Sequence, residues 1–185
     1  MGEIAERYRR RAEAFERKVA AVRADQWGNQ SPCAKWTARD VVEHVVTMHG
    51  VMLTPVARKL EPSDDPLTAF QEARAAIEDV LDDPVAALTE TDTPAGPMTT
   101  ERHIDEVVSD DLVLHGWDLA RATGQDELMD PLDVERLWAT AVAVPPELMA
   151  KYRTPGAVEV YGPEVPVPAD APLQDRLLGL LGREP

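Results

Sequence analysis

Apolar residues recur every three or four positions along most of the chain, and that spacing is the period of an α-helix. In residues 3–24 the apolar positions are Ile4, Tyr8, Ala12, Phe15, Val19 and Val22. Arginine and glutamate occupy most of the opposite face of this segment. The same spacing predicts further helices over residues 37–59, 67–81, 100–123, 131–143 and 171–181. The pattern is that of an all-α protein.

The helix expected at 37–59 has the clearest start signal. Thr37-Ala-Arg-Asp40 has the form of a capping box, in which the first and last residues bind each other's backbone N–H groups. Apolar residues cover much of the circumference of this helix, which predicts a central position in the fold. Pro55 lies inside it and predicts either a kink or the final turns.

Three stretches lack the helical spacing and are punctuated by glycine or proline: residues 25–36, 84–100 and 147–170. We expect the first two to be connecting loops, although Val85-Ala-Ala-Leu88 in the second is compatible with a helix. For residues 147–170 we expect an extended loop that wraps the fold, with a short hairpin as the alternative. The helices expected at 131–143 and 171–181 flank this stretch, so the C-terminal part adds helices to the bundle.

We expect one domain over residues 1–185, because no internal repeat or domain-scale linker interrupts the chain. Its bundle core would occupy about residues 3–124, and a C-terminal extension would occupy about residues 125–185. With 185 residues, of which 44% are apolar, the chain is long enough to bury a real core.

Charge and cysteine content narrow the surroundings in which the protein works. The net charge of −15 disfavours binding to nucleic acid or to an anionic membrane surface. Cys33 is the single cysteine, so an intramolecular disulfide is excluded, as suits a reducing compartment. The first ten residues lack the apolar core of a signal peptide, and no run reaches the roughly 18 apolar residues of a membrane span. We therefore expect a cytoplasmic protein.

The helix expected at 100–123 carries a carboxylate and an imidazole four residues apart, Asp111 and His115. Four residues advance a helix by about 400°, so these side chains lie roughly 40° apart and about 6 Å along the axis. They can therefore reach one ion together. Asp110 is five residues from His115 and lies on another face.

A third ligand has to come from another helix, and His44 in the helix 37–59 is the candidate. His49 is five residues further on, a rotation of about 140°, and leaves the face of His44. His103 is twelve residues before His115, or roughly 18 Å along a helix, which is too far to share an ion. His44, Asp111 and His115 therefore remain as a candidate set of metal ligands.

Two imidazoles and one carboxylate suit Zn²⁺, Fe²⁺ or Ni²⁺ and leave a coordination position open for water or substrate. The alternative is that His44 and His115 are core histidines whose ring nitrogens are satisfied by neighbouring side chains. Spacing alone does not choose between these interpretations, because an acid four residues before a histidine is common in helices.

Other reactive side chains have structural interpretations. Asp40 precedes His44 by four residues, and its place in the capping box is the better explanation, with support of a metal-bound His44 as the alternative. Cys33 is either a thiolate ligand or nucleophile, or else a small buried apolar residue, and the last is commoner. Asp118 and Arg121 have the spacing of a helical ion pair. The chain has no G-x-S-x-G, phosphate-binding glycine loop, H-E-x-x-H or C-x-x-C motif.

Two blocks together resemble a known family. The block Trp27…Ser31-Pro-Cys-Ala-Lys-Trp36-Thr-Ala-Arg-Asp40-Val-Val-Glu-His44 resembles the N-terminal motif of the DinB-like, mycothiol-dependent maleylpyruvate isomerase superfamily. The block Asp111-Leu-Val-Leu-His115-Gly-Trp-Asp-Leu-Ala-Arg-Ala-Thr-Gly124 resembles its second motif. The tail over residues 165–183 is similar to the C-terminus of an actinobacterial metal-binding subfamily.

The resemblance implies a DinB-type four-helix bundle whose divalent metal is held by His44, Asp111 and His115. The isomerase has glutamate where this chain has Asp111, which gives the carboxylate a shorter reach. The resemblance also implies mycothiol as the thiol and a homodimer formed through an exposed face of the bundle. About 60 residues follow Gly124, so we expect the separate C-terminal domain of the isomerase to be missing.

Three hypotheses about function follow. The first is a metal-dependent thiol transferase or isomerase, in which zinc, or else nickel or iron, lowers the pKa of a small-molecule thiol that then attacks an electrophilic substrate. The second is a non-catalytic metal-binding or sensor module on the same bundle. The third is a helical bundle that binds no metal.

Overall fold

A computed structural model describes residues 2–93, 96–154 and 161–185. The chain divides into two compact units. The first, here called the helical bundle, comprises Met1–Ser31 and Lys35–Glu127. The second, here called the C-terminal unit, comprises Pro32–Ala34 and Leu128–Pro185. The prediction of one domain over residues 1–185 stays a prediction.

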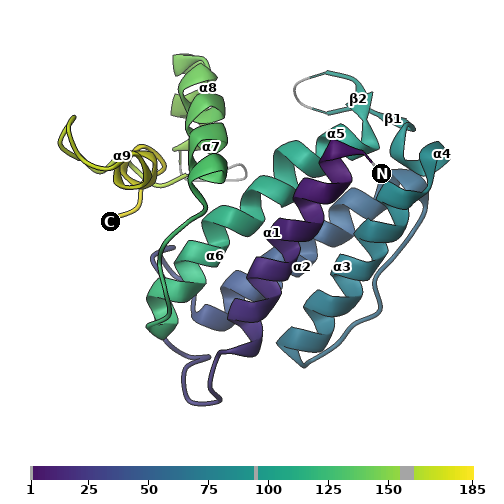
Figure 1. Cartoon of the computed structure of the whole chain (residues 1–185), viewed down its shortest axis with the longest axis horizontal. Helices are drawn as coiled ribbons and strands as arrows, with labels where there is room; N and C mark the ends of the chain where they lie inside the picture. Colours follow the sequence, from purple (N-terminus) through teal and green to yellow (C-terminus); the bar gives the residue numbers. More distant parts are fainter. Residues whose placement is uncertain (1, 94–95, 155–160) are drawn as a thin grey trace. The chain divides into compact units, whose positions relative to one another are not determined.

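The bundle is built from four long helices, α1 (Glu3–Ala20), α2 (Ala38–Leu53), α3 (Pro66–Asp82) and α6 (Asp110–Thr123). Both α1 and α2 pack against α3 and against α6, so each long helix has two neighbours around a common core (Figure 1). The predicted all-α, four-helix bundle is confirmed.

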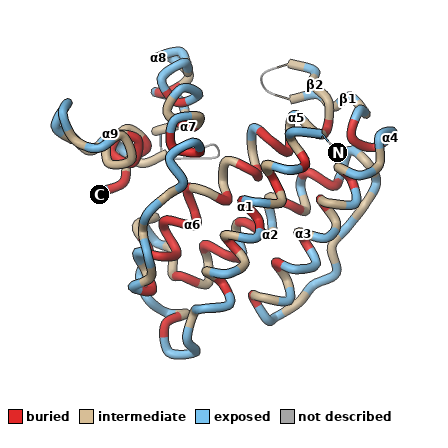
Figure 2. Tube along the Cα trace, in the orientation of Figure 1, coloured by how far each residue is buried: buried red, intermediate tan, exposed pale blue. Residues whose placement is uncertain are grey.

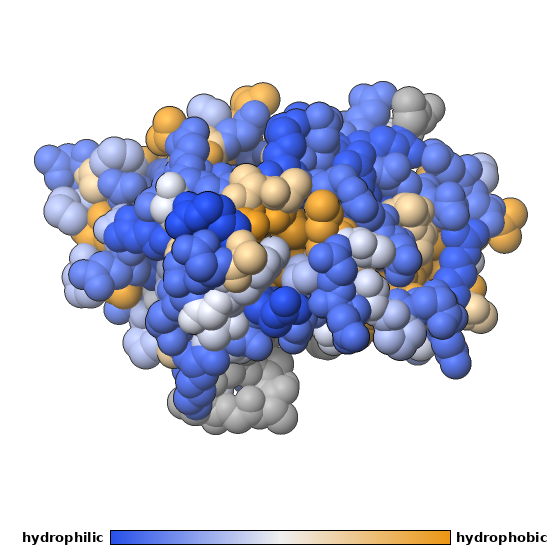
Figure 3. Space-filling model, turned by 90° about the horizontal axis from the view of Figure 1, so that it is seen from below, coloured by the Kyte–Doolittle hydropathy of each residue, from blue (hydrophilic) through white to orange (hydrophobic). Residues whose placement is uncertain are grey.

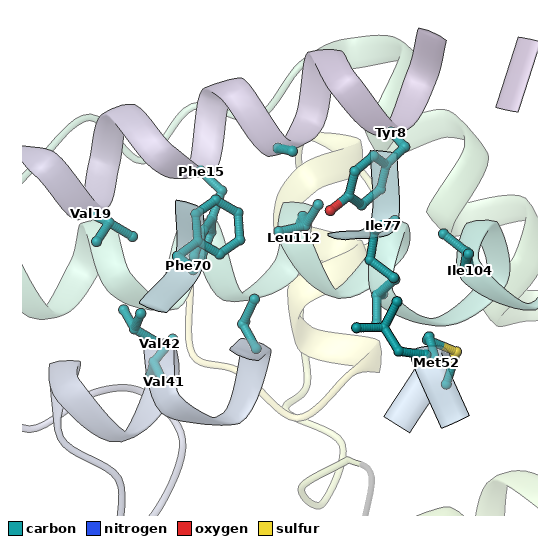
Figure 4. Close-up of a cluster of buried hydrophobic side chains, with 14 of the residues drawn as sticks. Tyr8, Phe15, Val19, Val41, Val42, Met52, Phe70, Ile77, Ile104 and Leu112 are labelled. Atoms are coloured by element: carbon teal, nitrogen blue, oxygen red, sulfur yellow. The ribbon is translucent and has the colours of Figure 1, made fainter. Parts of the chain in front are cut away.

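Aromatic and branched side chains from all four helices fill this core (Figure 4). The rings of Phe15 and Phe70 lie 4.8 Å apart and tilted, an arrangement that aromatic pairs prefer. Buried residues recur along one side of α1, α2 and α3, as an amphipathic pattern requires, whereas residues 114–120 of α6 are all buried (Figure 2). Members of the core include Tyr8, Phe15, Val19, Val41, Val42, Met52, Phe70, Ile77, Ile104 and Leu112.

The first two helices end earlier in the structure than the sequence predicted. The first helix ends at Ala20, four residues before the predicted end. The second ends at Leu53 and continues only as a 3₁₀ turn, η1 (Thr54–Val56), instead of running to residue 59. Pro55 explains this end, because proline lacks an N–H to donate and clashes with the preceding helical turn. Gly124 ends α6 in the left-handed conformation, with φ of 67°, which glycine adopts without steric cost.

The helix predicted over 100–123 is three segments in succession. These are α5 (Thr100–Ile104), the π-helical segment η2 (Asp105–Ser109) and α6. Two arginines of α1 bind the ends of η2: Arg7 donates to both carboxylate oxygens of Asp105, at 2.9 and 2.7 Å, and Arg11 donates to Ser109 Oγ at 2.9 Å. Helical periodicity in the sequence does not distinguish a π turn from an α turn, so the sequence missed this segment.

The connection between α3 and α5 contains more structure than the loop predicted for residues 84–100. A short helix, α4 (Pro84–Ala87), begins it. A two-stranded antiparallel ladder follows, in which β1 (Glu90–Thr91) pairs with β2 (Met98–Thr99). Residues 94–95 lie outside the described residues.

The C-terminal unit contains α7 (Pro131–Ala143), α8 (Pro146–Tyr152) and α9 (Leu173–Leu180), and α7 packs against α9. The helix α8 corrects the prediction of an extended loop from residue 147. A proline is tolerated in the first helical turn, so Pro146 starts this helix instead of preventing it. Residues 155–160 of the predicted loop lie outside the described residues.

The described residues 161–172 before α9 contain no helix or strand, in line with the predicted loop, and this segment lies against that helix. Val165 donates its backbone N–H to the carbonyl of Gly179 at 2.9 Å. A Cβ atom on Gly179 would lie only 2.4 Å from Val167 Cγ2 and 2.6 Å from the Val165 carbonyl oxygen. Glycine at position 179 therefore permits this close contact of backbone with backbone. The guanidinium of Arg176 lies 4.7 Å from the ring of Trp138, so a cation–π contact joins α9 to α7.

Within the described residues, no helix combines the length and apolar character needed to cross a membrane. Hydrophilic residues predominate on the face drawn in Figure 3, and hydrophobic residues gather there in patches.

Candidate metal centre

His44 of α2 and Asp111 and His115 of α6 lie together in the helical bundle. One potential ligand atom from each lies within 4.8 Å of those of the other two. His44 Nε2 is 3.7 Å from Asp111 Oδ2, and the two imidazole centroids are 4.9 Å apart, with their planes at 73°. The packing of α2 on α6 thus brings together all three side chains that the sequence selected.

Burial differs among the three residues. The side chains of His44 and Asp111 are 29% and 28% exposed, whereas that of His115 is 8% exposed. The cluster therefore has one buried member and two that small molecules in solvent can reach. A site for a metal with an open coordination position requires this combination of a fixed base and an accessible side.

His115 is held by a carboxylate that the sequence assigned to another partner. Its Nδ1 lies 2.9 Å from Oδ2 of Asp118, which is fully buried. With Nδ1–H donating to this carboxylate, Nε2 carries the lone pair, which is the tautomer that a metal ligand needs. Carboxylates commonly orient metal-binding histidines in this way, and they raise the basicity of the ring.

The predicted ion pair between Asp118 and Arg121 is therefore wrong. Arg121 donates to Glu127 Oε2 at 2.7 Å, and its guanidinium lies 5.5 Å from the ring of Trp117. The sequence did contain a signal for the observed contact. Asp118 follows His115 by three residues, and at that spacing two helical side chains can touch.

Trp36 lies beside both imidazoles. Its ring centroid is 4.7 Å from that of His44 and 5.8 Å from that of His115, both in tilted arrangements. The sequence predicted only a connecting loop over residues 25–36, because contacts between a loop and two helices depend on the tertiary fold.

The histidines that helix geometry set aside lie elsewhere. His49 is fully buried, with Nδ1 2.7 Å from the Val45 carbonyl oxygen and Nε2 2.9 Å from the Tyr8 hydroxyl. Burial lowers the pKa of His49 to about 4, although the hydrogen bond to Val45 opposes this shift. His103 lies in α5, and burial lowers its pKa as well.

Two carboxylates near the selected residues are engaged in structural contacts. Asp110 forms an ion pair with Arg11 at 2.7 Å, which agrees with its predicted position on another face of α6. Asp40 accepts the backbone N–H of Thr37 at 2.7 Å, and Thr37 Oγ1 accepts that of Asp40 at 3.3 Å. The capping box is confirmed, and hydrogen bonds from Thr37 lower the pKa of Asp40.

Cys33 belongs to the C-terminal unit, where its Sγ lies 3.5 Å from Nη2 of Arg183. The cysteine is half-buried rather than fully buried as the commoner interpretation predicted. Arg183 itself is buried, and its Nη1 donates to the Leu181 carbonyl oxygen at 3.0 Å. These contacts assign Arg183 to the packing of this unit.

The donor set of His44, Asp111 and His115 fits a divalent ion. For bonds of about 2.1 Å, tetrahedral geometry places ligand atoms roughly 3.4 Å apart. The separation of 3.7 Å between His44 and Asp111 is close to that value. The ligand atoms of the whole set lie within 4.8 Å of one another, and small side-chain rotations would shorten these separations to the tetrahedral value.

Comparison with known proteins gives the family. Residues 8–120 match the family model for the mycothiol maleylpyruvate isomerase N-terminal domain, a range that includes all three candidate ligands. The chain is 35% identical over 180 residues to the uncharacterized protein Rv0738 of Mycobacterium tuberculosis strain H37Rv, with 95% of each chain covered. It has the same identity and coverage with the uncharacterized protein MT0763 of strain CDC 1551 / Oshkosh. No solved structure matches the chain. The resemblance seen in the sequence is confirmed, and the chain belongs to the mycothiol maleylpyruvate isomerase N-terminal domain family, within the DinB-like superfamily.

Proposed function

We propose that the helical bundle binds one divalent metal ion through His44, Asp111 and His115 and uses it to activate a small-molecule thiol. The observation that carries this proposal is the meeting of three ligand atoms from two helices, within 4.8 Å of one another. The contact from Asp118 to His115 supports it further, because it favours the ring tautomer that a metal requires.

Zinc is the proposed ion, with nickel or iron as alternatives. Two nitrogen donors and one oxygen donor match the ligands that all three ions accept. Three protein ligands leave a position for a further molecule, which is the arrangement of catalytic zinc sites rather than structural ones. When bound, such an ion lowers the pKa of a thiol, so that the thiolate is present near neutral pH.

The chain's own residues would then hold the reactants. His115 is fixed by Asp118 and supplies the rigid side of the site, while the half-exposed side chains of His44 and Asp111 border the side from which a thiol can enter. In the proposed reaction the thiol proton passes to solvent and the thiolate sulfur bonds to an electrophilic carbon. The electron pair of the bond broken at that carbon goes to a leaving group or, at a double bond, to the neighbouring carbon, which takes up a proton from solvent.

The family description names mycothiol, which makes mycothiol the first thiol to test and a small electrophile its partner. We further propose that the protein works in the cytoplasm, where low-molecular-weight thiols are kept reduced. The net charge of −15 argues against nucleic acid as a partner. A homodimer is proposed from the resemblance alone, and light scattering would test it.

The decisive test is metal binding by protein from which metal has been removed. We expect near-stoichiometric Zn²⁺ by elemental analysis after reloading, and at least about a hundredfold weaker binding in calorimetry for His44→Ala and for His115→Ala. His103→Ala is the matched control, since it removes a histidine of the same bundle outside the cluster. Equal binding by the control and the two site variants would reject the proposed site.

Thiol transfer is tested separately. Metal-loaded protein is mixed with mycothiol and a small electrophile, and the loss of free thiol is followed against metal-free protein and free Zn²⁺. A rate above both references supports an enzyme. Tight metal binding with no rate above free Zn²⁺ would favour the alternative, a metal-binding or sensor module without turnover.

A further inference from the structure

We propose that Trp36 is a positioning residue for this metal site, holding the His44 imidazole in the orientation that binds the ion. This inference rests on the proposed metal site and adds a residue from outside the three ligands. It is carried by ring contacts that join the loop before α2 to one histidine on each of two helices.

The two imidazoles are held in different ways. His115 has the buried carboxylate of Asp118 on its Nδ1. For His44, contacts in the described part of the chain are the rings of Trp36 and His115 and the carboxylate of Asp111. No hydrogen bond to a carboxylate or carbonyl fixes the His44 ring there. The indole of Trp36 therefore takes the orienting role for His44 that Asp118 has for His115.

Trp36 is itself held in place by its backbone. Its carbonyl oxygen accepts the N–H of Ser31 and Nε2 of Gln30, both at 2.9 Å. Lys35, just before it, has φ of 71°, a left-handed conformation that turns the chain and that few residues other than glycine adopt. The capping box of α2 begins at the next residue, Thr37. The indole thus projects from a backbone fixed on both sides.

A fixed indole changes metal affinity by reducing the freedom of the histidine before the ion arrives. A histidine on a half-exposed helix face samples several rotamers, and binding an ion costs the entropy of choosing one. Contact with an aromatic ring restricts this choice in advance. An aromatic pair of this kind changes an equilibrium constant by about tenfold.

The experiment measures Zn²⁺ affinity by competition with a chelating dye in the full-length protein. We expect about tenfold weaker binding for Trp36→Ala and at most about threefold for Trp36→Phe, which keeps an aromatic ring. Trp27 is the matched control, because it lies in the same loop, packs on the core and has no ring contact with either histidine among the described residues. Trp27→Ala should leave the affinity unchanged.

Co²⁺ provides a second measurement, independent of affinity. A paramagnetic ion quenches the emission of an indole in its immediate surroundings, so saturating Co²⁺ should remove a component of the tryptophan fluorescence. That component should be absent from Trp36→Phe and present in Trp27→Phe. His44→Ala should show no quenching at matched Co²⁺. Substitution of a tryptophan that only packs the loop would not alter this signal.

The outcomes separate this inference from the metal site on which it rests. If the wild-type protein binds Zn²⁺ and Trp36→Ala binds it equally well, the positioning role is rejected and the metal site stands. Equal weakening by Trp36→Ala and Trp27→Ala would also reject it, since the effect would then come from loop packing. No Zn²⁺ binding by the wild-type protein overturns both. If Trp36→Ala fails to fold, Trp36→Leu takes its place, because it keeps apolar volume without a ring; Zn²⁺ affinity equal to that of the wild type in this variant rejects the positioning role.

Discussion

His44 and His49 lie five residues apart on the same helix, α2, and their surroundings could hardly differ more. His49 is fully buried, and both of its ring nitrogens have hydrogen-bond partners, the Val45 carbonyl and the Tyr8 hydroxyl. His44 is half-exposed and meets a carboxylate, a second imidazole and an indole. For His44, the sequence left a core role open as the alternative to metal binding.

The difference shows what makes a histidine available to an ion. A buried imidazole that both donates and accepts a hydrogen bond has no lone pair left for a metal, and freeing one would leave the Tyr8 hydroxyl without its acceptor. At His44 the neighbouring groups are themselves potential ligands, so they become more favourable partners when a cation is present. The rotation of about 140° between the two positions produces this division of roles.

The largest expected effect is the difference in stability between alanine variants of the two histidines. His49→Ala should lower the free energy of unfolding by about 3 kcal/mol, because it opens a cavity and leaves the Tyr8 hydroxyl buried without its partner. His44→Ala should cost at most about 1 kcal/mol, as expected for a half-exposed position. Urea denaturation of metal-free protein measures both.

Metal affinity should follow the opposite order in the same pair of variants. His49→Ala should bind Zn²⁺ as the wild type does, provided that it is measured under conditions in which it is folded. The assignment of a structural role to His49 and a metal-binding role to His44 would be contradicted if His44→Ala were the more destabilised variant, or if His49→Ala lost the metal.

The next effect is a dependence of stability on pH that belongs to His49. Its pKa is about 4 in the folded protein, compared with an ordinary value of 6.5. The unfolded chain therefore binds a proton between these values that the folded protein does not. The contribution of His49 to the free energy of unfolding is therefore fully present above pH 6.5. About 3 kcal/mol of it is lost as the pH falls toward 4.

Carboxylates also titrate in this range, so the measurement compares wild type with His49→Gln. Urea midpoints of metal-free protein at several values between pH 7 and pH 4 should fall more steeply for the wild type. Parallel curves for the two proteins would contradict the assignment of the slope to His49, and His103→Gln controls for a histidine with smaller burial.

The smallest effect concerns the two acids that precede histidines by four residues, Asp40 and Asp111. Asp40 caps α2, so Asp40→Ala should cost about 1 kcal/mol of stability while leaving Zn²⁺ affinity nearly unchanged. Asp111→Ala should weaken Zn²⁺ binding by about tenfold or more with little loss of stability. A loss of metal affinity in Asp40→Ala, measured by the same dye competition, would mean that the cap also orients His44.

Local sequence signals accounted for most of the bundle. Helical spacing predicted α1, α3 and α7 to within a few residues, and Thr37 and Asp40 predicted the start of α2, because caps and amphipathic faces depend on residues close in the chain. The same reasoning separated His44 from His49 and Asp111 from Asp110. Rotation along a single helix is sufficient for these distinctions.

Other features depended on contacts between residues far apart in sequence. The π turn of η2, bound at its two ends by Arg7 and Arg11 of α1, gave no periodic signal of its own. Proline within α8 misled the prediction for residues 147–152, because its position in the first turn mattered more than its presence.

The sequence by itself therefore determined which residues share a helix face, since that depends only on a rotation of about 100° per residue. Only the tertiary structure decided that the faces of α2 and α6 meet, that Asp118 supports His115 and that Trp36 lies against both histidines. The physical reason is that side-chain contacts across elements are set by how whole helices and loops pack, and packing sums weak interactions over the entire core.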